Sequence, residues 1–378
     1  MNKELVKISD ELFFQEGPGV RNTQYTTEGV KLLNVANLVD GRVDLSTSDR
    51  YISEEEAYGK YKHFLCDAGD LIVASSGIKV DYLDKKMGFI DETMLPLCMN
   101  TSTIRFKVLN PDRLRIRYFM YYLKSNSYKE QVFRHITGSA QLNYGPSHLK
   151  KMTFPLRSIF DQDAIVDRLN KIQSIIEKRV NELKRLDELI KARFVEMFGD
   201  VESGHYKYDT CKLSDVASVG SSHRVFTTEF VENGIPFYRG TEIGELANGR
   251  IPTDPYYISE EHYQRLVKDD TKPKVGDLLM PSICNKGQVW MVDTKAPFYY
   301  KDGRVLCISP DRTVFNSKFL QYFMKEKTFV EYPKMGSGST FAEFKIFLLK
   351  DMDVLIPPLE QQENFAAVVA QVDKSKAV

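Results

Sequence analysis

The residues with the clearest chemical potential are arginine, lysine, asparagine and glutamine side chains in the glycine-containing turns of both halves of the chain. Arginine and lysine suit the paired acceptors of guanine, and asparagine and glutamine suit the donor–acceptor pair of adenine. In the first half the base-reading candidates are Arg21, Asn22, Asn34, Asn37, Lys79, Gln141, Asn143 and Tyr144. In the second half they are Arg224, Arg239, Glu242, Asn285, Lys286, Gln288, Lys334, Ser337 and Ser339. The alternative for each is an ordinary turn residue, and we expect only a minority to contact a base.

Four lysines are predicted to contact phosphate, because a flexible point charge positions a nucleic acid without specifying its sequence. They are Lys150, Lys151, Lys345 and Lys350. The chain carries 52 basic and 52 acidic residues, but they are segregated. Residues 105–157 hold eleven bases and two acids, residues 304–350 hold eight and four, and residues 44–70 hold three and seven. This distribution predicts a positive face on a neutral molecule, and the alternative is a pair of basic surface helices without a partner.

The sequence contains no recognisable catalytic or metal-binding motif. No glycine-rich phosphate loop with a following Lys-Ser/Thr is present, and the six histidines lack the spacing of metal ligands. The sequence Asp254-Pro255-Tyr256-Tyr257 resembles the DPPY box of adenine methyltransferases but lacks its second proline. Neither a glycine-rich cofactor motif nor a counterpart in the first half accompanies it. We therefore expect no catalytic residue and no metal.

The candidate residues belong to two copies of one pattern, offset by about 200 residues. Seven short matches keep their order: Lys7 to Asp10 with Lys212 to Asp215, Gly41-Arg42 with Gly249-Arg250, Tyr51 to Glu55 with Tyr257 to Glu261, Gly69 to Ile72 with Gly276 to Leu279, Tyr121 to Lys124 with Tyr322 to Lys325, Gly138-Ser139 with Gly338-Ser339, and Leu149 to Met152 with Leu349 to Met352. This offset is far longer than the roughly 20 to 50 residues of a solenoid repeat. It predicts two whole domains of one type.

Each copy combines short strands with helices. The β-rich pieces are 71–74, 103–108 and 289–292, and helical patterns fit 113–133 and 317–330. A helical segment follows each copy.

The first of these segments, Asp161 to Phe198, is predicted to be one amphipathic helix, because its apolar residues recur in steps of three and four. Ser158 and Asp161 are candidate N-caps and Gly199 suits a C-terminal stop. About 38 residues at 1.5 Å each make a helix of roughly 57 Å. The second helix begins after Pro357-Pro358, and its apolar stripe is Phe365, Val368, Val369 and Val372.

The second helix has room for only about four turns. We therefore expect part of the first helix to lack an intramolecular partner and to form a partner-docking face. Its residues are Ile176, Val180, Leu183, Ile190, Phe194 and Met197. Another subunit or a second copy of the chain would cover this face, or the chain is a shortened variant.

Composition indicates a soluble globular protein, with 42% hydrophobic and 28% charged residues. No run approaches the roughly 18 apolar residues that span a membrane, and the N-terminal residues do not resemble a signal peptide. Five cysteines without a CxxC pair are typical of free thiols in a reducing cytoplasm.

Over its full length the sequence resembles the specificity (S) subunits of type I restriction–modification systems. The resemblance rests on the two divergent copies, the Gly-Asp-Leu turns at Gly69 and Gly276, and the glycine–serine loops at Gly138 and Gly336. The most specific segments are Ile356 to Gln362, which resembles the entry into the conserved helix of the family, and Arg193 to Asp200, which resembles its exit. The first copy departs from this pattern, with Phe154-Pro155-Leu156-Arg157 at its helix entry.

The resemblance implies an α+β fold with two similar mixed α/β target recognition domains, separated by long helices that pair as an antiparallel coiled coil. The expected segments are recognition domain 1 at 1–160, a conserved helical spacer at 161–203, recognition domain 2 at 204–356, and a shortened C-terminal conserved helix at 357–378.

The resemblance further implies a non-catalytic subunit of a restriction system, in which each domain reads one half of a bipartite double-stranded DNA target. Methylation subunits would dock on the helices, and restriction subunits would assemble through them. S-adenosylmethionine, ATP and magnesium would belong to those partners, and self-association through the uncovered helix is a further expectation. The competing interpretations are a nuclease or methyltransferase with an unrecognised site, and a coiled-coil scaffold with two protein-binding domains.

Overall fold

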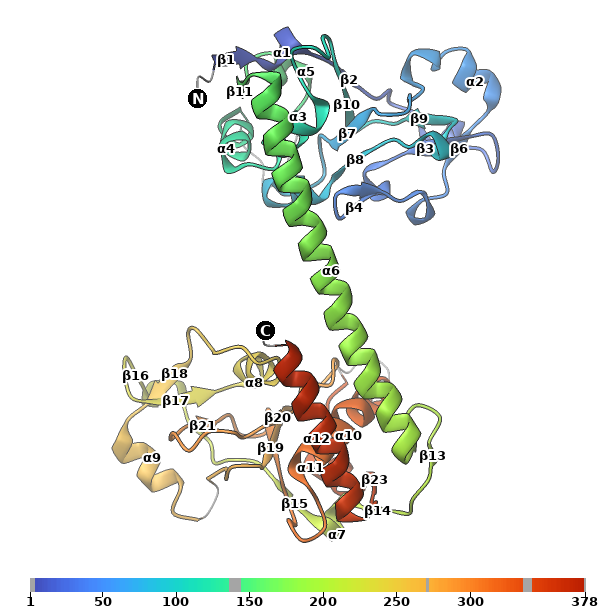
Figure 1. Cartoon of the computed structure of the whole chain (residues 1–378). Helices are drawn as coiled ribbons and strands as arrows, with labels where there is room; N and C mark the ends of the chain where they lie inside the picture. Colours follow the sequence, from blue (N-terminus) through green and yellow to red (C-terminus); the bar gives the residue numbers. More distant parts are fainter. Residues whose placement is uncertain (1–3, 136–143, 270–271, 336–341, 377–378) are drawn as a thin grey trace. The chain divides into compact units, whose positions relative to one another are not determined.

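The computed structural model describes residues 4–135, 144–269, 272–335 and 342–376. The chain divides into two compact units, Met1–Glu177 and Lys178–Val378, and the long helix α6 (Ile159–Phe198) contributes to both (Figure 1). The boundary between the two units, after Glu177, falls within the expected spacer at 161–203. Within the described residues, no helix is long and apolar enough to cross a membrane.

The strands of the first unit are β1 (Glu4–Lys7), β2 (Leu12–Glu16), β3 (Val30–Leu33), β4 (Leu38–Val39), β5 (Arg42–Val43), β6 (Tyr51–Ile52), β7 (Leu71–Ala74), β8 (Met87–Phe89), β9 (Leu97–Met99), β10 (Thr103–Val108) and β11 (Thr153–Leu156). Its helices are α1 (Ile8–Glu11), α2 (Glu54–Tyr58), α3 (Ile116–Leu123), α4 (Asn126–His135), α5 (Pro146–Leu149) and the first part of α6. Short 3-10 helices include η2 (Val35–Asn37), η3 (Leu45–Thr47) and η5 (Val80–Lys85).

The strands of the second unit are β12 (Gly199–Asp200), β13 (His205–Tyr206), β14 (Thr210–Lys212), β15 (Ala217–Gly220), β16 (Phe230–Val231), β17 (Ile235–Tyr238), β18 (Tyr256–Ile258), β19 (Leu278–Pro281), β20 (Trp290–Met291), β21 (Tyr299–Tyr300), β22 (Val305–Pro310) and β23 (Asp353–Leu355). Its helices are the second part of α6, α7 (Leu213–Val216), α8 (Gly240–Ala247), α9 (Glu260–Leu266), α10 (Ser317–Glu331), α11 (Ile346–Lys350) and α12 (Leu359–Lys376), with the 3-10 helix η8 (Tyr332–Met335).

The two units repeat the same sheet topology. The central sheet has the order β2-β10-β7-β8 in the first unit and β15-β22-β19-β20 in the second. A second sheet runs β6-β3-β9 in the first and β16-β18-β17-β21 in the second, and in each the last pair is parallel. A third pair joins β1 to β11 and β14 to β23. The matches in the sequence therefore correspond to a duplicated fold.

The Gly-Asp-Leu repeats are turns that lead into the buried central strands β7 and β19. Gly69 and Gly276 have φ of +86° and +87°, a conformation that favours glycine. The carboxylate of Asp70 accepts the backbone N–H of Asp67, and that of Asp277 accepts the N–H of Lys274, each at 2.9 Å. These repeated residues close a turn and are not base-reading candidates.

Equivalent glutamine hydrogen bonds hold the N-terminal end of α6 in the first unit and that of α12 in the second. The Gln162 side chain accepts the N–H of Arg115 and donates to the carbonyls of Arg113 and Arg157. Gln362 accepts the N–H of Asn316 and donates to two carbonyls in the same way. Both glutamines are fully buried. The Ser158 hydroxyl, one of the two predicted N-caps, accepts the backbone N–H of Asp161.

The end of α6 is set by Gly199, as the sequence predicted. Its φ is +95°, and a Cβ there would lie 2.1 Å from the carbonyl oxygen of His205. Only glycine therefore allows β12 to fold back against β13 at this point.

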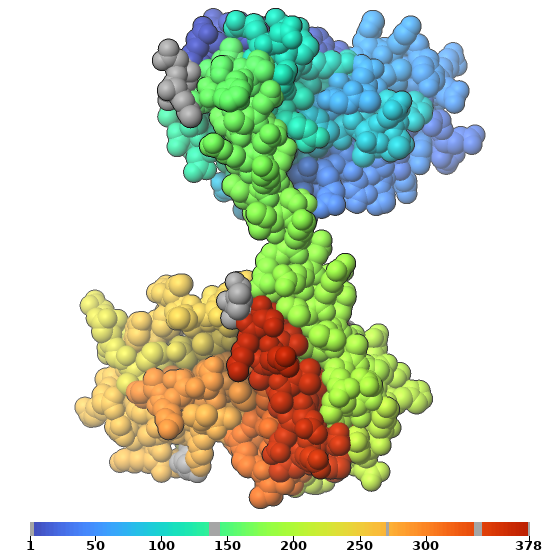
Figure 2. Space-filling view, viewed as in Figure 1, coloured from blue at the N-terminus to red at the C-terminus, as the bar shows by residue number. Residues whose placement is uncertain are grey.

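The expectation that the apolar face of α6 has no intramolecular partner is wrong for its last turns. Ile190 and Phe194 are 4% and 2% exposed, and Met197 packs against the same core. Helix α12 covers them: it runs antiparallel to α6, with Phe365 against Phe194 and Lys376 paired with Asp187. Figure 2 shows α12, in red, packed against the green second half of α6.

Helix α12 covers these turns despite its shortness, because in the antiparallel arrangement it starts beside the end of α6. Helix α10 adds Phe319, Tyr322 and Phe323 to the same cluster. The remaining residues of the predicted docking face are more open. Ile176 and Val180 are 51% and 60% exposed, and Leu183 is partly buried.

The predicted helix at 113–133 is two helices, α3 and α4. The Ser125 hydroxyl donates to the carbonyl of Tyr122 and lies 3.3 Å from the backbone nitrogen of Tyr128, so it ends one helix and starts the next. The interruption lets both Phe119 and Tyr128 reach the core of the first unit. The equivalent prediction at 317–330 matches the single helix α10.

Candidate nucleic-acid interface

In the second unit, three distant segments meet at the C-terminal end of β19. The N–H of Ser282, just after the strand, donates to the carbonyl of Arg304 at 2.9 Å. The N–H of Phe344 donates to the carbonyl of Ser282 at 2.7 Å. Phe344 thus lies beside the start of the loop 282–289.

Helix α8 completes this end of the second unit. A Cβ on Gly240 would lie 3.1 Å from Cβ of Pro281, the last residue of β19. A Cβ on Gly244 would lie 3.9 Å from Cγ of Gln288 in the loop 282–289. The start of α8, the residue Arg239 before it and the loop after β19 therefore belong to one surface.

The loop 282–289 presents polar side chains to solvent. Asn285 and Lys286 are exposed, and the Gln288 side chain accepts the backbone N–H of Lys286 at 3.0 Å. This hydrogen bond stabilises the loop through the main chain of Lys286 and does not involve its ammonium group. The three candidates predicted here therefore lie together.

Further basic side chains are exposed in the same unit. Lys334 is in η8, and Lys345 and Lys350 flank and end α11. Arg304, which sequence reasoning did not single out, is 3.0 Å from Glu343 and lies beside the start of the loop. In the sequence, only the position of Arg304 in the basic segment 304–350 indicated a role in binding. The backbone contact between Arg304 and Ser282 could not be predicted, because it has no local sequence pattern.

The first unit repeats this arrangement at the C-terminal end of β7. The N–H of Ser75 donates to the carbonyl of Ser102 at 2.8 Å, and the N–H of Tyr144 donates to the carbonyl of Ser75 at 3.0 Å. Ser75 and Tyr144 thus occupy the places of Ser282 and Phe344. The loop after β7 carries the exposed candidate Lys79.

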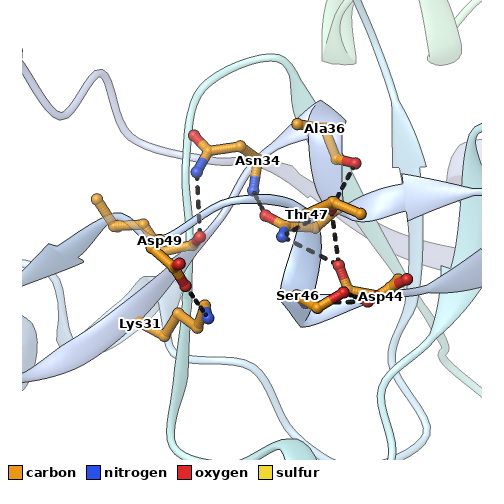
Figure 3. Close-up of polar contacts among 9 residues, drawn as sticks. Lys31, Asn34, Ala36, Asp44, Ser46, Thr47 and Asp49 are labelled. Atoms are coloured by element: carbon orange, nitrogen blue, oxygen red, sulfur yellow. Dashed lines mark hydrogen bonds and ion pairs between the residues drawn. The ribbon is translucent and has the colours of Figure 1, made fainter.

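Asn34 and Asn37 were predicted to read bases, and the structure shows that they do not face solvent. They are 9% and 0% exposed. The Asn37 side chain accepts the N–H of Asn34 and donates to Asp44, while Asn34 binds the carbonyl of Leu32 and the amide of Asn100. Figure 3 shows Asn34 in this network, with Thr47 bonded to Asp44. Their hydrogen-bonding capacity is used within the fold.

Tyr144 and Glu242 were also predicted to read bases, and this prediction is wrong because both side chains are buried. Tyr144 is 1% exposed, and its burial raises the pKa of the phenol. Glu242 is 3% exposed and accepts the N–H of Arg239 at 2.7 Å. Burial opposes its ionisation, but the hydrogen bonds from Arg239 outweigh this and lower the pKa of Glu242 below its ordinary value.

The other candidates have mixed positions. Arg21, Asn22 and Arg224 are exposed, and the Arg224 guanidinium lies 5.4 Å from the ring centre of Phe226. Lys150 and Lys151, which follow α5, are also exposed. Gln141, Asn143, Ser337 and Ser339 lie outside the described residues.

The described part of the chain contains no group of three or more His, Cys, Asp or Glu side chains that could hold a metal ion. The two sites share one backbone framework at the end of a buried central strand, and each has an exposed lysine in the following loop, Lys79 in the first unit and Lys286 in the second. Such groups can bind phosphate and base edges.

Part of the chain is similar to a known protein family. Residues 24–185 match the type I restriction modification DNA specificity domain. Two specificity subunits of Methanocaldococcus jannaschii are similar: that of the type I restriction enzyme MjaVIII is 22% identical over 50% of this chain, and that of MjaIX is 28% identical over 49%. Each match spans 43% of the relative, so less than half the length of these proteins is covered.

Solved structures share the fold. The S subunit of the type I restriction–modification system from M. genitalium has a TM-score of 0.55 and 17% identity, over 100% of this chain and 90% of that one. A chain from a structure on complex assembly and conformational transition of the type I R-M system has a TM-score of 0.54 and 16% identity, over 99% and 91%. Residues 24–185 are thus similar to the type I restriction modification DNA specificity domain, and the chain has the fold of solved S subunits.

Proposed function

We propose that this chain is the sequence-specific DNA-binding subunit of a type I restriction–modification complex, and that each unit reads one half of a bipartite target. The observation that carries the proposal is the repeated site at the C-terminal ends of β7 and β19. In both units the same three backbone segments meet there, and the loop that follows the strand carries an exposed lysine, Lys79 or Lys286. Two equivalent sites in one chain suit two separate stretches of duplex.

In this proposal the methylation subunits dock on the helices, and restriction subunits assemble through them. Three exposed apolar side chains on α6 support contact with another protein: Ile172, Ile175 and Ile176. Neighbouring exposed apolar side chains of this kind mark sites of protein–protein interaction. S-adenosylmethionine, ATP and magnesium act on the partner subunits, and the chain works in the cytoplasm without a cofactor of its own. Self-association through the exposed turns of α6 is an alternative use of the same face.

A domain exchange tests the two-reader proposal. Residues 1–160 are replaced by the corresponding domain of another family member with a known target, and the chain is expressed with its methylation partner. Sequencing of methylated sites in the host DNA should show one changed half-site and one that is retained. The matched exchange of residues 204–356 should change the other half only. If either exchange altered both halves or neither, the proposal would be wrong.

A further inference from the structure

The guanidinium group of Arg239 is held in a fixed position at the start of α8. Its Nη2 lies 2.5 Å from Oε1 of Glu242, and its Nε lies 3.1 Å from Oε2. The carboxylate also accepts the backbone N–H of Arg239, so it fixes both the main chain and the side chain. Because Glu242 is 3% exposed, this carboxylate is itself held by the fold.

An aromatic stack supports the flat face of the same guanidinium. The Arg239 Cζ lies 4.3 Å from the ring centre of Tyr256. Tyr256 stacks on Phe230 at 4.7 Å with an angle of 27° between the rings, and Phe230 packs against Phe237 at 5.1 Å. Phe237 is fully buried, so the stack is anchored in the sheet of β16, β18, β17 and β21. The plane of the guanidinium is therefore set before any ligand binds.

Glu242 contacts one edge of the Arg239 guanidinium. A guanidinium carries five N–H donors, and Glu242 takes the edge formed by Nε and Nη2. The terminal edge, formed by Nη1 and Nη2, can donate two parallel hydrogen bonds to a pair of acceptors. The side chain is 38% exposed, and it lies beside the loop 282–289 that carries Lys286.

Charge decides between a phosphate and a base as the ligand. The ion pair of Arg239 with Glu242 is neutral as a whole, and its carboxylate would repel a phosphate placed against it. The O6 and N7 atoms of guanine are neutral acceptors at the spacing of an arginine fork, and a prepositioned arginine binds them without further ordering cost. Phosphate contacts then belong to exposed lysines such as Lys345 and Lys350, which the sequence predicts for that role.

The equivalent turn of the first unit, residues 34–37, contains no arginine. The residues in the equivalent turn, Asn34 and Asn37, make the corresponding backbone hydrogen bond and turn their amides inward. The two units thus differ in chemistry at one place in a shared fold, which is what two different half-sites require.

We propose that Arg239 reads a guanine in the half-site bound by the second unit, with Glu242 and Tyr256 as its positioning residues. The proposal rests on the proposed function and names one contact within it. It predicts a G·C pair at one position of that half-site.

The test is a selection from a randomised duplex DNA library by the full chain in complex with its methylation partner, followed by sequencing. Arg239→Lys keeps the charge next to Glu242 but removes the planar fork. It should lower the preference for guanine at one position of one half-site by about tenfold, and leave the other half-site unchanged. Arg312→Lys is the matched control, because Arg312 is 42% exposed and pairs with the buried Asp277 at the opposite end of β19. The control should select the wild-type motif.

Two further variants separate reading from folding. The double variant Arg239→Gln/Glu242→Gln removes both charges, so no unpaired carboxylate remains buried, and it should lose the guanine at the same position. Glu242→Gln alone keeps the arginine and an acceptor for its N–H, and should weaken the preference at that position only. A motif that stays the same in the Arg239 variants, or that changes equally in Arg312→Lys, would overturn this proposal alone. A wild-type complex that selects no motif would overturn the proposed function and this contact with it.

Discussion

Truncation of Phe194 should destabilise the second unit strongly, because this ring fills the centre of its core. Phe194 is 2% exposed, and five aromatic rings have their centres within 6.4 Å of its own. Phe194→Ala removes these contacts and leaves a cavity that a rigid core fills poorly, which costs about 3 to 5 kcal/mol. Val180→Ala on the same helix is the matched control. Val180 is 60% exposed, so its truncation should cost about 0.5 kcal/mol or less.

The assay is urea denaturation followed by tryptophan fluorescence. Trp290 is the single tryptophan of the chain and is 4% exposed in the second unit, so its emission reports the unfolding of that unit alone. A double-mutant cycle with Phe365→Ala, whose ring centre lies 5.4 Å from that of Phe194, should give a coupling of about 0.5 to 1.5 kcal/mol. If Phe194→Ala cost no more than Val180→Ala, α12 and α10 would not cover this end of α6 in solution.

Three further predictions concern hydrogen bonds, phosphate contacts and pH. Gln362→Leu should cost about 2 to 4 kcal/mol in urea denaturation, because it leaves one backbone N–H and two carbonyls without their buried partner. Charge reversal of Lys150 and Lys151 to glutamate should weaken binding to all duplex sequences and reduce the slope of log K against log salt by about 2. The pKa of Glu242 is lowered from its ordinary value of 4.5, so its stabilisation is complete above pH 4.5 and is lost as the pH falls through the lower folded value. The melting temperature of the second unit should therefore fall more steeply below pH 4.5 in the wild type than in Glu242→Gln.

Each of these has a control within the chain. Gln371→Leu, at an exposed position of α12, should have little effect, and an equal loss in both variants would contradict the role of the buried amide. Reversal of Lys60 and Lys62, which are exposed in the acidic segment 44–70, should leave the salt dependence unchanged. Loss of binding to only one sequence after reversal of Lys150 and Lys151 would argue against phosphate contact. Equal acid sensitivity of the wild type and Glu242→Gln would show that the ion pair adds no stability.

Local chemistry explains why some parts of the fold were predictable. The period of the apolar residues in α6 and the φ requirement at Gly199 are properties of neighbouring residues, and the helix ends where they indicate. The buried strand β7 was visible as an apolar run for the same reason. The break between α3 and α4 was not predicted. It depends on the Ser125 hydroxyl, which donates to the backbone carbonyl of Tyr122 rather than to solvent.

The candidate site was only partly predictable. Exposed loop residues such as Lys79 and Lys286 are where the glycine-containing turns suggested. Asn34 and Asn37 have the same residue type and turn context as a base reader, yet their amides bond inward to segments as distant as Asn100. Sequence spacing carries no information on such contacts, because they depend on which strands pair.

By itself, the sequence determined that this protein is a duplicated α+β chain with a long amphipathic helix, since repeats and helical period depend only on residue order. The tertiary structure decided which polar groups remain for a ligand and which faces are covered. Glu242 and Arg239 illustrate this: they are three residues apart, yet Glu242 is buried and the Arg239 side chain remains 38% exposed. That difference arises because β19 and the aromatic stack under Tyr256 meet the start of α8, and only folding brings them together.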